Sequence, residues 1–257
     1  SAAAEAAEAF ADYYADLEKK EINLNFWPDV KHRISLSYPF HPELIRVLDS
    51  RVGTIPSFQR TRGALRLLAE AVADLWSKRT DAVIINVADL PLDADAVANA
   101  LTRAIDRETF AQVIEADVAG PGSHAADVDK ARFTGTTPYT TRAATTVFVH
   151  SLEQTPSRGA TSVDVLRGTV APGHEPDFVE EALAQLDLSA WHLDYDGVRW
   201  RFDTEPNPRK IVEDEKQAVP NSRVREELEH RIERMFAPFG PVKTRVFPVG
   251  PEEVEDR

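Results

Sequence analysis

Apolar residues recur at spacings of three and four in the first part of the chain, a pattern typical of amphipathic helices. Residues 2–19 combine such a stripe with a remainder rich in Ala and Glu, so we predict a helix with a solvated acidic face. The stripe consists of Phe10, Tyr13, Tyr14 and Leu17.

Two further helices are predicted before residue 80. Pro42 suits the first position of a helix because its missing N–H would have no helical partner there. The apolar face of that helix is made of Leu44, Ile45 and Leu48. Residues 61–78 carry a longer face, which we expect to pack on the other helices, and it comprises Leu65, Leu68, Ala69, Val72 and Trp76. Residues 1–80 are therefore predicted to form a small helical bundle.

The middle of the chain begins with a short β-branched run. Residues 82–88 (AVIINVA) are almost entirely apolar, which predicts a buried strand. Gly-Pro-Gly at 120–122 and Thr-Pro at 137–138 break the stretch that follows. We expect helices over 93–105, 107–116, 123–132 and 139–151. Residues 152–161 are expected to form an exposed loop.

A helix followed by a hairpin is the clearest local pattern. Asp177 is placed to cap a helix, and residues 191–202 alternate apolar and polar positions around Asp196-Gly197. Asp-Gly is a favoured two-residue hairpin turn. A helix that leads into a two-stranded hairpin has the outline of a winged helix.

The end of the chain completes the expected organisation. We predict helices over 208–219 and 221–236, and a strand-like run at 241–248 with no partner after it, as in a piece of a longer protein. Three parts are expected: the bundle at 1–80, a winged-helix-like domain at 81–219 with the hairpin at 191–202, and a connecting helix with the start of a truncated next domain at 220–257. The expected fold class is mainly α with a small β component.

Composition excludes several kinds of chemistry. The 257 residues include no cysteine, which rules out disulfides, thiolate zinc sites and cysteine nucleophiles and makes a cytoplasmic location the simplest expectation. With 30 basic and 43 acidic residues the formal net charge is −13, which opposes general association with nucleic acid. The chain has no long apolar run and no signal-peptide pattern, so we expect no membrane partner.

The sequence contains no complete motif for nucleotide binding or catalysis. No Gly is followed by Lys, which excludes the phosphate-binding loop, so the run that ends at Asp89 is interpreted as core rather than as a magnesium-binding strand. Neither a Gly-x-Ser-x-Gly elbow nor a His-Glu-x-x-His helix is present. His41 at a helix start, and His124 close to Asp127 and Asp129, are interpreted as structural residues. No metal site is expected.

Two stretches of the sequence resemble a known family. Residues 37–45 (SYPFHPELI) and 55–69 (IPSFQRTRGALRLLA) are similar to very large prokaryotic ATPases of the AAA+ type. Further matches at 141–151 and 191–211 extend the resemblance over most of residues 30–257. Members are often encoded in anti-phage defence loci and are similar in layout to BREX-system ATPases. There the nucleotide-binding core precedes this region. The resemblance therefore implies an upstream ATPase core in the same polypeptide and other defence-complex proteins as partners. It also implies that ATP and magnesium bind in the parent protein and not to this chain alone.

The resemblance also implies a role for arginines at the start of the helix at 61–78. In origin-recognition-type ATPases an arginine of the lid helix reaches the γ-phosphate of ATP. Arg62 is the candidate for this sensor role, and Arg60 is the second candidate for nucleotide contact, because the task needs a permanently charged, planar donor on a rigid helix. The alternative is that these arginines only solvate a helix end. The expected architecture is thus an AAA+ lid-like helical bundle followed by a winged-helix-like domain.

Basic residues gather at the predicted wing. Residues 198–210 hold four basic and two acidic side chains, a balance of 4 − 2 = +2, which predicts a local phosphate contact with DNA. The basic residues are Arg199, Arg201, Arg209 and Lys210. The alternatives are that the wing docks a protein, or that its arginines pair with the chain's own carboxylates.

The leading hypothesis from the sequence is a non-catalytic lid and winged-helix part of an AAA+-like ATPase, which couples the ATP state to a DNA or protein partner in phage defence. The alternative is a free-standing winged-helix adaptor that binds DNA or protein without nucleotide chemistry. An independent hydrolase has no motif in its favour.

Overall fold

A computed structural model describes most of the chain. The described residues are 1–54, 58, 61–80, 82–102, 109–153, 155, 157–208, 210–212, 216, 219–236, 246–248 and 250. The chain divides into two compact units, Ser1–Lys210 and Ile211–Arg257.

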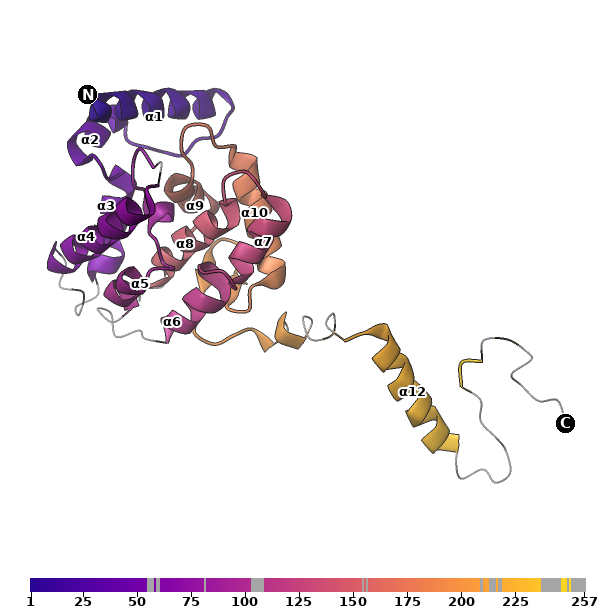
Figure 1. Cartoon of the computed structure of the whole chain (residues 1–257). Coiled ribbons are helices and arrows are strands. Elements are labelled where there is room, and N and C mark those ends of the chain that lie inside the picture. The colour runs from indigo at the N-terminus through magenta and orange to yellow at the C-terminus, as the bar shows by residue number, and fades with distance from the viewer. Residues whose placement is uncertain are drawn as a thin grey trace. The chain divides into compact units, whose positions relative to one another are not determined.

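The first unit is mainly helical, as the sequence predicts (Figure 1). Its α-helices are α1 (Ala2–Lys19), α2 (Val30–Ser37), α3 (Pro42–Ser50), α4 (Thr61–Lys78), α5 (Asp95–Thr102), α6 (Phe110–Val113), α7 (His124–Arg132), α8 (Tyr139–Ser151), α9 (Ser162–Thr169) and α10 (Pro176–Ser189). Short 3-10 turns are η1 (Val52–Thr54) and η3 (Val87–Asp89), and η5 (Ile114–Val118) is a π-helical turn. The strands are β1 (Leu193–Tyr195) and β2 (Trp200–Phe202).

Helix α8 forms the centre of the first unit, and Figure 1 shows α7, α9 and α10 around it. Every residue of α8 except Thr141 and Arg142 is buried. A helix that is apolar or small on all sides has to be surrounded by other elements, because no face of it gains from contact with water. The core of the unit is therefore built outward from α8.

The hairpin pairs β1 and β2 in antiparallel register, with Leu193 opposite Phe202. Asp196 closes the turn, because its Oδ1 accepts hydrogen bonds from the backbone N–H groups of Val198 and Arg199 at 3.0 and 2.9 Å. Ala160, between α8 and α9, forms an isolated antiparallel bridge with Trp200. The hairpin expected at 191–202 is thus present, and one residue of an earlier segment pairs with its second strand.

The N-terminal helices are fastened to α9 by Arg167. This side chain donates hydrogen bonds to the backbone oxygens of Leu24 and Asn25, the second at 2.6 Å, and its guanidinium lies 5.6 Å from the centre of the Phe26 ring. Arg167 therefore joins the segment after α1 to an element that is more than 140 residues away in the sequence.

The strand expected at 82–88 is wrong. Ile84 and Ile85 are buried, but only Ile85 forms a bridge, with Phe40, and the chain then enters the 3-10 turn η3. Pro39 and Pro42 stand close to Phe40 on either side and lack the N–H groups that a longer ladder would need. The run is a buried extended segment and not a strand.

The prediction of which face of the helix at 61–78 is buried is also wrong for most of its residues. The bounds of α4 agree with the prediction, but the buried side chains are Leu67, Leu68 and Ala71. Leu65 and Trp76 are 63% and 83% exposed. Both faces of α4 are apolar, so periodicity alone does not tell which one packs inward.

Other differences concern short elements. Helices α2 and α9 are not among the predicted elements, and the loop expected to be exposed at 152–161 buries Leu152, Glu153 and Ala160. The helix predicted at 107–116 continues as the π-helical turn η5. Helices expected at 2–19, 139–151 and 221–236 are confirmed.

The second unit contains α12 (Asn221–Phe236), none of whose side chains is buried. Much of the helix predicted at 208–219 and of the strand predicted at 241–248 lies outside the described residues. The expected divisions after residues 80 and 219 do not coincide with the division after Lys210. In the part of the chain that the structure describes, no helix combines the length and apolarity needed to cross a bilayer.

Candidate functional site

The residues predicted to contact ATP lie at the start of α4. Arg62 is exposed in the first turn of this helix, whereas Arg60 lies outside the described residues. Leu65, Val72 and Trp76 follow Arg62 by 3, 10 and 14 residues, which places all four side chains on one face of an α-helix. Arg62 therefore stands at one end of an exposed apolar stripe, which we call the α4 stripe.

The predicted wing arginines are held by carboxylates of the chain itself. Arg201 forms ion pairs with Asp194, with Asp196 at 3.0 Å and with Asp203 at 3.3 Å. These three aspartates surround the guanidinium on the hairpin. Its charge is compensated locally, as one of the sequence-based alternatives expects.

Of the other basic residues predicted to bind DNA, those that the structure describes also lie next to carboxylates of the chain. Lys210 donates hydrogen bonds of 2.7 Å to Asp187 of α10 and to the backbone oxygen of Leu193. Arg199 lies 4.0 Å from Asp164 and donates a 3.3 Å hydrogen bond to the backbone oxygen of Gly159. Arg209 lies outside the described residues.

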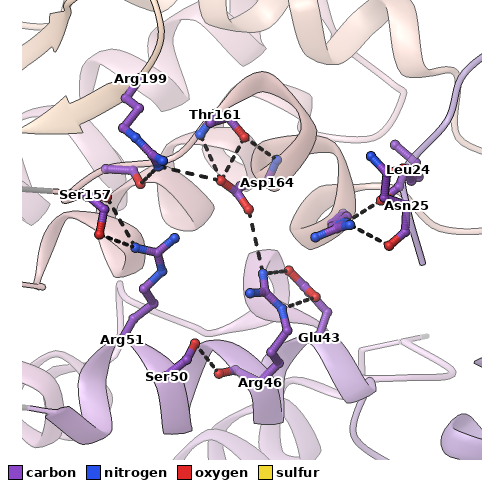
Figure 2. Close-up of polar contacts among 12 residues, drawn as sticks. Leu24, Asn25, Glu43, Arg46, Ser50, Arg51, Ser157, Thr161, Asp164 and Arg199 are labelled. Carbon is purple, nitrogen blue, oxygen red and sulfur yellow. Dashed lines mark hydrogen bonds and ion pairs between the residues drawn. The ribbon is translucent and has the colours of Figure 1, made fainter. Parts of the chain in front are cut away.

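Charged side chains from α3, α9 and the hairpin meet in one cluster, and Figure 2 shows its members Glu43, Arg46, Arg51, Asp164 and Arg199 in close-up. We call it the α3–α9 charge cluster, and it consists of Glu43, Arg46, Arg51, Glu153, Asp164 and Arg199. Three arginines are matched by three carboxylates. The cluster is therefore neutral as a whole.

Asp164 is the link between the two sides of this cluster. Arg46 makes two short hydrogen bonds to Glu43 of its own helix, at 2.8 and 2.5 Å, and lies 3.7 Å from Asp164 (Figure 2). Asp164 also forms a capping box with Thr161 at the start of α9. The carboxylate thus holds the beginning of α9 while it faces arginines from both α3 and the hairpin.

His150 of α8 lies beside the α3–α9 charge cluster and is completely buried. Neither ring nitrogen has a hydrogen-bond partner. The pKa of His150 is lowered to about 4, mainly because the charged imidazolium would lose its hydration on burial. The carboxylates of Asp164 and Glu153 act to raise this pKa, and the nearby Arg51 and Arg46 act to lower it. His150 is therefore neutral at pH 7.

A second buried carboxylate, Asp117, lies in the π-helical turn η5. It accepts hydrogen bonds from Nδ1 of His124 at 2.6 Å and from the backbone N–H groups of Trp191 and His192 at 3.1 and 2.7 Å. Burial by itself would raise the pKa of Asp117, but these hydrogen bonds outweigh burial and lower it. The negative charge is thus stabilised inside the fold and joins η5 to the start of the hairpin.

A family model for the DUF499 second domain matches residues 5–184. The chain belongs to the DUF499 second-domain family. The match runs from α1 into α10, so it covers the α4 stripe and most of the α3–α9 charge cluster of this DUF499 second domain. No curated protein and no solved structure matches the chain.

The DUF499 second domain also contains a cavity of about 470 Å³, between α1, Thr80 with residues 82–84, the start of α8 and the loop before α10. Asp89 and Arg142 line it and form an ion pair with each other. Asp89 also accepts a 2.9 Å hydrogen bond from the backbone N–H of Asn86, and Arg142 donates to the backbone oxygen of Thr169. Asp89 is therefore satisfied within the fold, in line with its interpretation as core.

The described residues offer no cluster of three or more His, Asp or Glu arranged to hold a metal ion. The Asp117 site and the α3–α9 charge cluster are not among the sites predicted from the sequence. His124 was noted for its nearness to Asp127 and Asp129, but its partner is Asp117. No sequence signal identifies either site, because the residues of each follow no local spacing. They lie up to 75 residues apart in the Asp117 site and up to 156 residues apart in the α3–α9 charge cluster.

Proposed function

We propose that this chain is a non-catalytic coupling module of an AAA+-like ATPase. In this proposal α4 docks on an ATP-binding core of the parent polypeptide, and the part that follows acts on a protein partner. The family resemblance supports the ATPase assignment, and a family described as a second domain supports a role beside another domain. ATP and magnesium would be bound by the parent protein.

The α4 stripe is the observation that carries the proposal. Trp76, Leu65 and Val72 are large apolar side chains that remain in contact with water on a regular, 18-residue helix. Exposed tryptophans with neighbouring aliphatic residues are typical of binding hot spots. Arg62 on the same face would stand at the rim of the docked surface, where a permanently charged guanidinium can reach the phosphates of a nucleotide. An arginine that only solvates a helix end would not need an apolar stripe beside it.

The order of elements in the later part supports a winged-helix assignment. Helix α8 is followed by Ala160, which pairs with Trp200, then by α9, α10, β1 and β2. This is the order helix, strand, helix, helix, hairpin that a winged helix has. In it α10 takes the place of the helix that contacts the partner.

The charges of α10 favour a protein partner over DNA. The helix contains four acidic residues, Asp177, Glu180, Glu181 and Asp187, and no Lys or Arg. DNA repels such a helix, because affinity for phosphate requires Lys and Arg and the release of counterions. The wing arginines do not offset this, since carboxylates of the chain compensate them.

The α3–α9 charge cluster supports coupling between the two parts. Arg46 on α3 and Arg199 on the hairpin both face Asp164, which completes the capping box of α9 with the N-cap residue Thr161. A shift of α3 would change the balance of charge on Asp164 and so act on the start of α9 and on the hairpin. Charged groups in a low-dielectric setting transmit such a change over a few ångströms.

The ATPase part of the proposal is tested in the full-length parent protein. Replacement Arg62→Ala is expected to lower the rate of ATP hydrolysis tenfold or more, because the phosphate contact is lost. Arg66→Ala, four residues further along the same helix, is the matched control and is expected to change the rate less than twofold. Equal effects of the two replacements would contradict the proposal.

The choice of partner is tested with duplex DNA at low salt. The chain is expected to show no binding that depends on its wing, so Arg199→Glu together with Arg201→Glu should leave the anisotropy of labelled DNA unchanged. Tight binding that the double replacement abolishes would favour the free-standing DNA-binding adaptor instead. The isolated chain is expected to have no ATP turnover of its own.

A further inference from the structure

The solvent face of α10 combines acidic and large apolar side chains. We call it the α10 surface, and it consists of Asp177, Phe178, Glu180, Glu181 and Leu188. Leu188 is 77% and Phe178 41% exposed. Exposed apolar side chains inside a charged rim are typical of surfaces that bind other proteins.

The spacing of these residues defines a line along the helix. Asp177, Glu181 and Leu188 are separated by four and seven residues, so their side chains follow one another on one face, while Phe178 lies at its flank. Phe178 and Leu188 are ten residues apart, which corresponds to about 15 Å along the helix axis. Glu180 and Glu181 lie between these two apolar ends, and Asp177 immediately precedes Phe178.

Phe178 is a rigid anchor and not a loose surface side chain. Its ring lies 5.4 Å from that of Tyr139 and 5.9 Å from that of Phe133, measured between ring centres. The buried neighbours fix the ring, while its outer edge stays exposed. A fixed aromatic group loses little conformational entropy when a partner covers it, which makes it suited to binding.

The charge of the α10 surface is not compensated among the described residues. Asp187, on the same helix, pairs with Lys210, and the hairpin aspartates pair with Arg201. No ion pair within the described parts of the chain reaches Asp177, Glu180 or Glu181. Three neighbouring negative charges repel one another, and a cationic partner would relieve this repulsion.

We infer that the α10 surface binds a basic amphipathic helix of a protein partner. The helix has two apolar side chains about 15 Å apart, which cover Phe178 and Leu188, and Lys or Arg between them, which face Glu180 and Glu181. This inference rests on the proposed function only for the choice of a protein as the partner. The surface itself is defined by the exposed side chains of α10.

The inference is tested with the isolated chain and a synthetic 18-residue helical peptide that carries two Leu ten residues apart and Lys between them. Binding is measured by fluorescence anisotropy. Two control peptides are used: one replaces Lys by Glu, and the other keeps the composition but places the two Leu side by side. We expect each control peptide to bind at least tenfold more weakly.

Variants of the chain locate the binding site. Glu180→Lys with Glu181→Lys is expected to weaken peptide binding at least tenfold, and Leu188→Ala about fivefold, with unchanged circular dichroism. Asp12→Lys with Glu18→Lys on α1 is the matched control, because it makes the same charge change at exposed positions, and it should alter binding less than twofold.

Three results would overturn the inference. The first is an equal loss of peptide binding in the α1 and α10 charge variants, which would indicate nonspecific electrostatic attraction. The second is a concentration-dependent dimer that Glu180→Lys with Glu181→Lys abolishes, which would assign the surface to a second copy. The third is direct binding of labelled duplex DNA to the α10 surface, measured without the cationic peptide. All arms use the isolated chain without ATP, so they are independent of the Arg62 test.

Discussion

Asp117 Oδ2 accepts a 2.8 Å hydrogen bond from Nδ1 of His192, a residue 75 positions further along the chain. The same carboxylate is completely buried and receives three other hydrogen bonds. It is therefore the main polar link between the π-helical turn η5 and the start of the hairpin.

Replacement Asp117→Asn is expected to lower the free energy of unfolding by about 2–4 kcal/mol, because an amide accepts through one oxygen only and turns its NH₂ group toward donors. Urea denaturation measures the change. Asp127→Asn on the exposed side of α7 is the control and should stay within about 0.5 kcal/mol. A loss no larger than that of the control would falsify the structural role given to Asp117.

Buried histidines predict a loss of stability in mild acid. Burial lowers the pKa of His41 to about 3 and that of His150 to about 4, from an ordinary value of 6.5. The unfolded chain binds protons below pH 6.5 while the folded chain does not, so stability falls as the pH decreases. Each of the two histidines is expected to lower the free energy of unfolding by about 1.4 kcal/mol when the pH falls from 7.5 to 5.5.

The measurement is the urea midpoint of the chain between pH 7.5 and 5.5. His150→Leu keeps the volume but removes one titrating group, so its stability should fall by about 1.4 kcal/mol less than that of the unmodified chain over this range. Parallel pH profiles of the two proteins would show that folding does not lower the pKa of His150.

Arg46 is expected to stabilise the fold through Glu43. The Glu43 side chain is only 1% exposed, so removing its partner leaves a buried negative charge without compensation. Arg46→Ala should lower the free energy of unfolding by about 3 kcal/mol. Arg33→Ala, which breaks the exposed pair with Asp29, is the control and should cost less than about 1 kcal/mol. Similar losses in the two variants would contradict the role of Arg46.

Gly159 is expected to tolerate no side chain. Its φ is +97°, and a Cβ atom would lie 2.5 Å from the backbone oxygen of Trp200, so Gly159→Ala both strains the backbone and pushes apart the bridge between Ala160 and Trp200. Gly173 has a φ of +88° but nothing within 4 Å of the added atom. Gly173→Ala should therefore cost about 1–2 kcal/mol, and Gly159→Ala clearly more. Thermal denaturation of the two variants measures both losses of stability. Gly173→Ala reports the backbone strain alone, and Gly159→Ala reports the strain together with the steric clash.

The sequence predicts those elements whose signal is local. The helix at 2–19 has one apolar stripe, so both its bounds and its buried face follow from periodicity. The hairpin follows from the two alternating runs on either side of Asp196-Gly197. The register places Gly197 and Val198, and not Asp196 and Gly197, at the centre of the turn, and Gly197 has the positive φ that its first central position requires. In both cases a few neighbouring residues determine the outcome.

The sequence does not predict features that depend on distant partners. On α4 both faces are apolar, and only the surrounding structure decides that Leu68 packs inward and Trp76 does not. In the run at 82–88, strand propensity is overruled because the segment around Phe40 has prolines on both sides. Asp117 and Asp164 become sites only when the fold brings together residues from separate elements.

The contact of Arg167 with Leu24 and Asn25 bears on the biosynthesis of the protein. The ribosome releases the N-terminus first, at about 5–20 residues per second. Arg167 is synthesised 143 residues after Leu24, so the segment that follows α1 waits on the order of 10 s for the side chain that fastens it. During this time the aromatic side chains Phe10 and Tyr14 of α1 can pack only on early neighbours such as Phe26 and His41, and not on the elements that follow α8. The first unit closes only after synthesis has passed α9, and until then α1 is a segment that molecular chaperones can recognise.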